Sequence, residues 1–195
     1  MQERIIDLTW YGPFLWFGKD DASVFQFSQA SRPGIYLWTV PHQDGHLIYY
    51  VGETGKSFTE RLTAHAKEYL SGTYRIYEPN KFALGEKELI WPDTWMQGTQ
   101  RLIPEFMARY EELAPLLQEF LLKMRIFLGP IETDARTRKR IEAEIAKTTT
   151  HLAVRTNKFQ ETEIRYARRT PDENPVTVRM KSTVRILDLP SIITA

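Results

Sequence analysis

Apolar and β-branched residues gather in two short runs in the first third of the chain. Residues 34–40 (GIYLWTV) and 46–52 (HLIYYVG) are both rich in Ile, Val and aromatic side chains. The polar segment between them, PHQDG, contains a glycine that suits a tight turn. Because strands are enriched in such side chains and short glycine-containing loops join antiparallel neighbours, the pattern predicts a β-hairpin.

Two segments carry apolar residues at helical spacing. Residues 57–70 (SFTERLTAHAKEYL) place them on one face, and Ser57 or Thr59 is a suitable N-cap. Residues 100–123 show a second strong helical pattern. Pro115 lies inside this segment and is expected to kink or split the helix, because proline removes one backbone hydrogen bond and clashes with the preceding turn.

The second half of the chain adds strands around another helix. Residues 124–131 (MRIFLGPI) predict a third strand that ends at a Gly-Pro pair. A helix is then expected to begin after Asp134 and to fade at the β-branched threonines 148–150. Residues 176–189 (VTVRMKSTVRILDL) alternate between apolar and polar positions and predict one long strand or a hairpin.

The opening stretch, residues 8–18 (LTWYGPFLWFG), is aromatic but interrupted by Gly and Pro, so it predicts a loop or short strand. The whole order is β-β-α, a helical insertion, β-α and a C-terminal β element. We therefore expect an α/β fold of the α+β type in a single domain, 1–195.

Composition excludes several classes of protein. A hydrophobic content of 42% with 12% aromatic residues excludes a disordered chain. There is no cysteine, no apolar run long enough to cross a bilayer and no apolar signal segment near the start. We expect a cytoplasmic protein without a membrane partner. The net charge of +1 gives no global signal for a nucleic-acid partner, so such a surface has to be local.

The segment GETGKS invites comparison with a nucleotide-binding P-loop. That motif needs a first glycine five positions before Gly55, so that the backbone wraps the phosphates. Tyr50 stands at that position, and Gly52 lies two residues too late. The loop is too short to enclose a phosphate chain, which disfavours the P-loop interpretation.

The same region carries an ordered set of other motifs. GIY at 34–36, YVG at 50–52, and Arg61 with His65 on the following helix resemble the GIY-YIG nuclease family. In that family a later strand precedes a helix with one glutamate. Here the strand at 124–131 precedes the segment IEAEIAK at 141–147.

The resemblance implies a GIY-YIG fold: a small, mostly antiparallel sheet flanked by helices, with a helical insertion and a C-terminal β extension. The matching core covers about 34–70 and 124–157. The insertion at about 71–123 is absent from the minimal domain. Residues 1–33 form an N-terminal extension, and residues from about 158–195 form the C-terminal β extension.

The resemblance also implies a one-metal active site for phosphodiester hydrolysis. It assigns the catalytic roles to Tyr36, Tyr50, Arg61, His65 and Glu142, with Lys56 and Asn157 in support. The family's proline before the asparagine is missing here. Glu144 competes with Glu142 for the metal, but the register of the helix favours Glu142.

These residue types suit the chemistry. Glu142 is a hard oxygen ligand for Mg²⁺, with Mn²⁺ as a substitute; its structural alternative is an ion pair with Arg138 one turn away. Arg61 offers a fork of donors for a phosphate, and His65 lies one turn later on the same face as a proton shuttle or phosphate donor. One of the two tyrosines would take a proton from water, and which one stays open. A free tyrosine pKa of about 10 has to be lowered by a cation for that role.

The expected partner is DNA, with a homodimer left open. Elements outside the minimal domain would supply binding surface, and Trp91 and Trp95 would either stack on bases or pack on the helix at 100–123. The fused recognition elements resemble those of a type II restriction endonuclease. A repair, recombination or mobile-element nuclease and a non-catalytic DNA-binding module on the same fold are the alternatives. The candidate phosphate contacts are Arg165, Arg168, Arg169, Arg179, Lys181 and Arg185.

Overall fold

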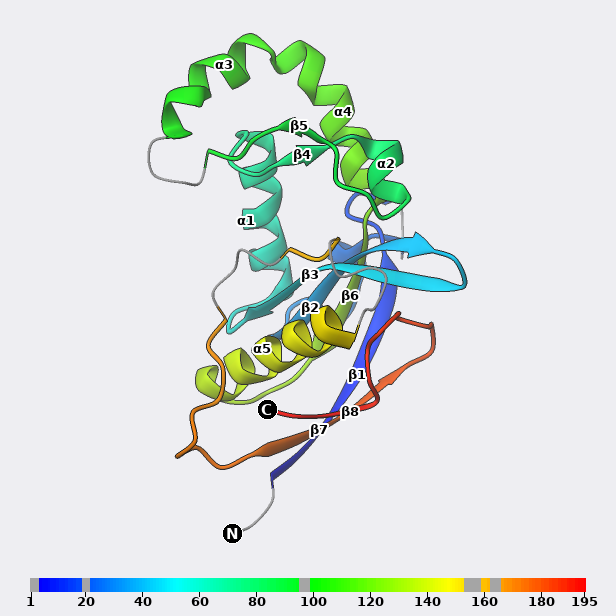
Figure 1. Cartoon of the computed structure of the whole chain (residues 1–195), viewed down its shortest axis with the longest axis vertical. Coiled ribbons are helices and arrows are strands. Elements are labelled where there is room, and N and C mark those ends of the chain that lie inside the picture. The colour runs from blue at the N-terminus through cyan, green and yellow to red at the C-terminus, as the bar shows by residue number, and fades with distance from the viewer. Residues whose placement is uncertain (1–3, 19–21, 95–98, 153–158, 162–165) are drawn as a thin grey trace.

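The computed structural model describes residues 4–18, 22–94, 99–152, 159–161 and 166–195 (Figure 1). Its centre is a six-stranded sheet in the order β3-β2-β6-β1-β7-β8. Within the described chain, β1 and β7 run parallel and the other neighbouring strands run antiparallel, so the expected mixed α/β architecture is confirmed. The strands are β1 (Arg4–Phe14), β2 (Gly34–His42), β3 (Gly45–Thr54), β6 (Arg125–Pro130), β7 (Val176–Ser182) and β8 (Ile192–Thr194).

Strands β2 and β3 form the predicted hairpin, and β6 is the predicted third strand on the other side of β2. In the hairpin, Tyr36 lies opposite Gly52 and Trp38 lies opposite Tyr50. Strand β3 ends the order of the six-stranded sheet, and in the described residues its outer side forms backbone hydrogen bonds with short segments, at His46 with residues 185–187 and at Tyr49 with Glu161. The candidate site forms around the second half of β3 and the facing part of β2, where Tyr36 lies opposite Gly52.

The N-terminal segment differs from its prediction as a loop or short strand. Residues from Arg4 to Phe14 form the long strand β1, which lies between β6 and β7. Leu8 and Trp10 are buried, whereas the alternating positions Asp7 and Thr9 are exposed. The extension therefore completes the sheet, and burial of alternate side chains outweighs the effect of the Gly-Pro interruption.

Helices cover both faces of the β2–β3–β6 half of the sheet. Helix α1 (Phe58–Leu70) and the insertion pack on one face, where Tyr36 and Trp38 point. Helix α5 (Ala135–Leu152) packs on the other face, where Ile35 and Leu37 point. Successive strand residues alternate between the two cores, as the pleat requires.

Helix α5 begins as predicted, because the Asp134 carboxylate accepts a hydrogen bond from the Thr137 amide. The expected fading at the threonines is wrong, since the helix continues to Leu152. The hydroxyls of Thr149 and Thr150 donate to carbonyls one turn earlier, which lets the helix keep these β-branched residues.

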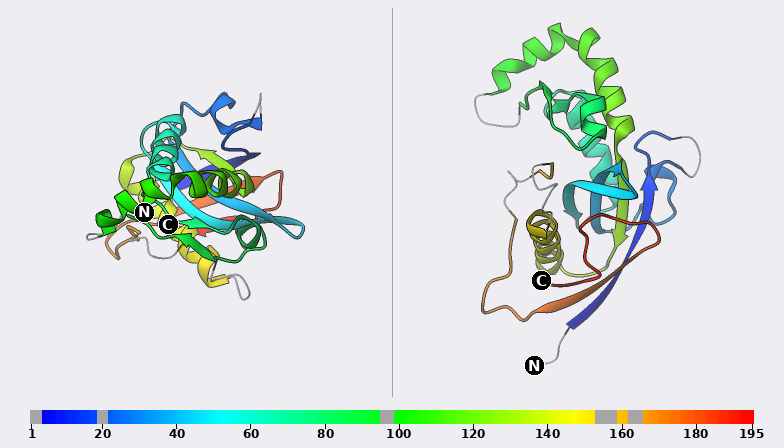
Figure 2. Two further views of the ribbon diagram at one scale, coloured as in Figure 1. Left: turned by 90° about the horizontal axis from the view of Figure 1, so that it is seen from above. Right: turned by 45° about the vertical axis from the view of Figure 1, so that its right-hand side comes forward.

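The insertion forms a cap at one end of the molecule, away from β1, β7 and β8 (Figure 2). The predicted split of its long helix occurs at Arg109 and not at Pro115, which lies inside α4. Trp91 is buried and its indole N–H donates to the Gly72 carbonyl, so it packs in the insertion. The elements are β4 (Ile76–Tyr77), α2 (Pro79–Ala83), β5 (Leu89–Trp91), the 3-10 helix η3 (Thr99–Leu102), α3 (Ile103–Ala108) and α4 (Tyr110–Lys123).

The remaining elements are short. A 3-10 helix, η2 (Val24–Gln26), follows β1. The C-terminal pattern forms the strand β7, and the chain then returns antiparallel to it as β8. None of the helices in the described ranges combines the length and apolar character that a bilayer span needs.

Candidate active site

Tyr36 crosses the edge strand at Gly52. A Cβ atom on Gly52 would lie 2.3 Å from Cζ of Tyr36 and 2.4 Å from its hydroxyl oxygen. Only glycine leaves room for the phenol at this point, since any other side chain would overlap it. The YVG glycine is therefore required by the close approach of the GIY tyrosine.

Helix α1 brings Arg61 and His65 to the same phenol. The Ser57 side chain caps the helix by accepting a hydrogen bond from the Glu60 amide, which fixes Arg61 in the first turn. Nε of Arg61 donates to the Tyr36 hydroxyl over 3.3 Å. Nε2 of His65 lies 2.7 Å from the same oxygen.

Burial sets the protonation of these groups. It holds the pKa of Tyr36 well above its ordinary value, and the neighbouring Tyr50 acts in the same direction while Arg61 opposes it. Burial also lowers the pKa of His65 to about 3, with the Arg61 charge acting in the same direction. His65 is therefore a neutral ring at physiological pH.

Tyr50 is the more accessible of the two tyrosines. Its ring lies 5.9 Å from that of Tyr36, centroid to centroid, and its side chain is partly exposed, whereas Tyr36 is fully buried. Burial raises the pKa of Tyr50, and the charge of Glu142 acts in the same direction. Tyr50 thus lies between the buried phenol and the carboxylate of α5.

Glu142 lies at the same edge of the sheet as the other candidates. Burial, together with the charge of the nearby Glu53, raises the pKa of Glu142 to about 7, whereas a hydrogen bond from the Glu53 backbone amide and the positive charges of Arg61 and Lys139 act in the opposite direction. These interactions require Glu142 to be close to Arg61 and to the end of β3, on which α5 packs. The structure therefore joins Tyr36, Arg61 and His65 by direct contacts, with Tyr50 beside Tyr36, and Glu142 is near enough for its charge to act on Tyr50 and Arg61.

Arg138 does not pair with Glu142, although the two are one helical turn apart. Its Nε donates to the Glu53 carboxylate over 3.1 Å, and both side chains are largely buried. Its Nη1 donates to the Thr133 carbonyl. In the part of the chain that the structure describes, Glu142 has no ion-pair partner, and its carboxylate interacts with the backbone amide of Glu53.

The predicted supporting residues and the alternative glutamate either form ion pairs elsewhere or lie outside the described residues. Lys56 is exposed and pairs with Glu60 on the surface of α1, so it does not lie against the tyrosines. Asn157 lies outside the described residues, as does Trp95. Glu144, the competitor of Glu142, pairs with Lys147 over 3.0 Å on the side of α5.

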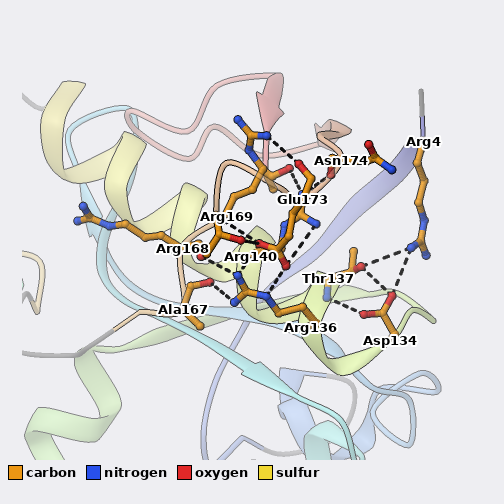
Figure 3. A network of polar contacts seen from close by, with 12 residues as sticks. Arg4, Asp134, Arg136, Thr137, Arg140, Ala167, Arg168, Arg169, Glu173 and Asn174 are labelled. Carbon is orange, nitrogen blue, oxygen red and sulfur yellow. Dashed lines mark hydrogen bonds and ion pairs between the residues drawn. The ribbon is translucent and has the colours of Figure 1, made fainter. Parts of the chain in front are cut away.

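The predicted basic residues do not form one patch. Arg168 and Arg169 are exposed in the loop beside α5, where Arg136 donates to the Arg168 carbonyl and forms a two-pronged ion pair with Glu173 (Figure 3). This network holds the loop in place and leaves the Arg168 side chain exposed. Arg165 lies outside the described residues.

The other three basic residues lie elsewhere. Arg179 and Lys181 are exposed on β7, alternating with the buried Val178 and Met180. Arg185 pairs with Asp44 at the turn between β2 and β3. The described members of this set thus come from a loop, a strand and a turn, and their contact with DNA stays a prediction.

A metal ion would have to rely mainly on Glu142. Among the residues that the structure describes, no three His, Asp or Glu side chains are grouped to hold a metal ion. The repulsion between Glu53 and Glu142 nevertheless favours a cation at this point. A single carboxylate with water ligands fits Mg²⁺, which keeps several waters in protein sites.

Two further residues contact the site but belong to none of the GIY-YIG motifs in the sequence. Glu53 directly follows the YVG motif, and Tyr74 enters from the insertion, where its hydroxyl lies 3.0 Å from Nδ1 of His65. The adjacency of Glu53 to Gly52 could have indicated the first. Nothing in the local pattern indicates the second.

No family model matches this chain, and comparisons with curated proteins and with solved structures also find no match. The resemblance to the GIY-YIG family therefore depends on the motifs and on the geometry of the residues that carry them.

Proposed function

We propose that the protein is a metal-dependent DNA endonuclease that hydrolyses phosphodiester bonds with a one-metal site of the GIY-YIG type. The observation that supports this most is the location of Glu142. It comes from a helix on the opposite face of the sheet from α1, yet its charge acts on Tyr50 and Arg61, which lie beside Tyr36.

Arg61 is the phosphate ligand in this proposal. Its side chain is exposed at the surface of α1, and only Nε is used in the bond to Tyr36. Its guanidinium stays charged, because the nearby phenols raise its pKa against the effect of burial. The remaining donors can bind a non-bridging oxygen and offset the charge that develops at phosphorus.

Tyr36 is the base in this proposal, and Tyr50 orients the water or the phosphate. Because burial raises the pKa of Tyr36, contrary to the expected lowering, Tyr36 cannot act as a free phenolate and has to pass on its own proton as it takes one from water. A neutral His65 lies 2.7 Å from the Tyr36 oxygen and can accept its proton as Tyr36 takes one from water. Arg61 and Tyr50 cover the hydroxyl in the free protein. When Arg61 turns toward a phosphate, the Tyr36 oxygen becomes accessible to the attacking water.

Glu142 would hold the metal ion. When bound, the ion acts as a Lewis acid that stabilises negative charge on the phosphate and its leaving oxygen. Arg138 supports this role indirectly, because it pairs with Glu53 on β3 and not with Glu142.

Cleavage of supercoiled plasmid in Mg²⁺ tests the proposal. The wild-type protein should nick or linearise the plasmid, and Glu142→Ala should be inactive. Glu144→Ala is the matched control, because it removes a carboxylate from the same helix that pairs with Lys147 on the surface. Absence of cleavage with both Mg²⁺ and Mn²⁺ would refute the function, and wild-type cleavage by Glu142→Ala would refute the metal assignment.

The type II restriction enzyme is the member of the class that we favour. Strands β1, β7 and β8 and the insertion extend the minimal domain and provide surface for recognition. A restriction enzyme should cut a long DNA into discrete fragments. A smear of products would favour a repair or recombination nuclease instead.

A further inference from the structure

Four side chains form a continuous line of hydrogen-bonding groups that ends in the insertion. Nε of Arg61 donates to the Tyr36 oxygen, which lies 2.7 Å from Nε2 of His65. Nδ1 of His65 in turn lies 3.0 Å from the Tyr74 hydroxyl. The buried imidazole is thus contacted at both nitrogens by phenols from two different parts of the chain.

His65 is almost completely buried, whereas Tyr74 is partly exposed. The ring also packs between Trp38 and Tyr74, with centroid distances of 4.8 Å and 5.7 Å. Such packing fixes the orientation of the imidazole. A proton that reaches His65 from Tyr36 can therefore continue only through Nδ1, in the direction of Tyr74 and the surface.

We propose that Tyr74 of the insertion is a positioning residue that completes a proton relay from Tyr36 through His65 to solvent. This inference rests on the proposed function. It also gives the insertion a part in the active site, since Tyr74 lies between α1 and β4.

The relay requires one tautomer of His65. Nδ1–H donates to the Tyr74 oxygen, so that Nε2 is free to accept the Tyr36 hydroxyl proton. Without an acceptor at Tyr74, nothing would hold the proton on Nδ1. Tyr74 therefore acts through His65 and touches neither the phosphate nor the water.

Each proton in the transfer has a donor and an acceptor. As water attacks phosphorus, its O–H bond breaks and the proton joins the Tyr36 oxygen. The original Tyr36 proton passes to Nε2, the Nδ1 proton passes to the Tyr74 oxygen, and the Tyr74 hydroxyl proton leaves to solvent water. The reverse shift resets the chain: Tyr74 takes a proton from solvent, and Tyr36 gives its proton to the departing product.

The concerted shift explains how a buried histidine can assist without becoming an imidazolium ion. Burial and Arg61 both oppose a positive charge on this ring, which lowers its pKa to about 3. In the relay, one proton leaves Nδ1 as another reaches Nε2. The ring stays neutral throughout, so the desolvation penalty is avoided.

Nitrogen-15 NMR of histidine-labelled protein tests the tautomer, with His65→Gln used to assign the signal. The wild-type ring should be neutral and protonated at Nδ1 at pH 7, and Tyr74→Phe should move the proton to Nε2. Tyr69→Phe is the control, because Tyr69 packs against Tyr74 in the same aromatic cluster, whereas the two ring nitrogens of His65 contact Tyr36 and Tyr74. A wild-type ring protonated at Nε2, or an unchanged ring in Tyr74→Phe, would overturn the relay.

Single-turnover cleavage of DNA separates this inference from the function beneath it. Tyr74→Phe should cleave about 10-fold more slowly than wild type, a small part of what general acid–base catalysis supplies, and Tyr69→Phe should keep the wild-type rate. An active enzyme whose Tyr74→Phe variant is equally fast would overturn only the relay. A wild-type protein that cleaves no DNA would overturn the proposed function and the relay with it.

Discussion

Replacement of Glu142 by Gln should make the metal-free protein more stable at alkaline pH. Glutamine keeps the size of the side chain and resembles the protonated carboxyl. The wild-type carboxylate is held against Glu53 at a partly buried position, which raises its pKa to about 7 from an ordinary 4.5. The charge therefore opposes folding whenever it is present.

The magnitude and its pH window follow from linkage. Because the folded-state pKa is the higher one, the favourable contribution of Glu142 is complete below pH 4.5 and is lost as the pH rises to about 7. A shift from 4.5 to about 7 corresponds to at most about 3.5 kcal/mol, at about 1.4 kcal/mol per pKa unit. Partial exposure and relaxation reduce this, so we expect a gain of about 1–2 kcal/mol at pH 8.

Urea unfolding in EDTA at pH 5 and pH 8 measures the effect. The midpoint of Glu142→Gln should exceed that of wild type at pH 8, and the difference should shrink toward pH 5 with an unchanged slope. Glu144→Gln is the control, because loss of its surface pair with Lys147 should change stability by no more than about 0.5 kcal/mol. A destabilised Glu142→Gln at pH 8, or a gain independent of pH, would show that the electrostatic reasoning is wrong.

Three further outcomes are expected. Addition of Mg²⁺ at pH 8 should raise the melting temperature of wild type but not of Glu142→Gln, because only a bound ion stabilises the folded state; equal shifts would place the ion elsewhere. Gly52→Ala should cost about 1–3 kcal/mol in urea unfolding and abolish cleavage, since the new Cβ overlaps the Tyr36 phenol; a neutral substitution would contradict the close approach. Arg138→Gln should lower the free energy of urea unfolding by about 3 kcal/mol, because it leaves the largely buried Glu53 without its ion-pair partner. A decrease below about 1 kcal/mol would mean that the pair contributes little to stability.

The strands and helices around the site could be predicted because their side-chain periods are regular. The hairpin, the helix after it and the start of α5 at Asp134 all follow from local patterns. The long strand β1 could not, because its partners are distant in sequence and Gly12 with Pro13 interrupts its pattern. Helix α5 extends further than expected, since hydroxyl bonds to the backbone offset the low helix propensity of its threonines.

The candidate site was predictable in its residue types but not in its pairings. Arg138 can reach an acid on its own helix or one on β3, and the tertiary structure brings it to Glu53. Among the described residues, this choice leaves Glu142 without an ion pair. Spacing along the helix alone would instead have predicted a pair between Arg138 and Glu142. The contact of Tyr74 with His65 depends on the path of the chain after α1, which packing of the insertion decides.

The central claim is that Tyr36 and Glu142 act on one phosphate from two faces of the sheet. The most direct test is single-turnover DNA cleavage by three variants: Tyr36→Phe, Glu142→Gln and the double variant. Each single substitution should slow cleavage at least about 100-fold. The double variant should be no slower than the slower single variant, because residues that act as a unit are not additive. Wild-type rates in either single variant, or losses that multiply in the double variant, would contradict a shared site.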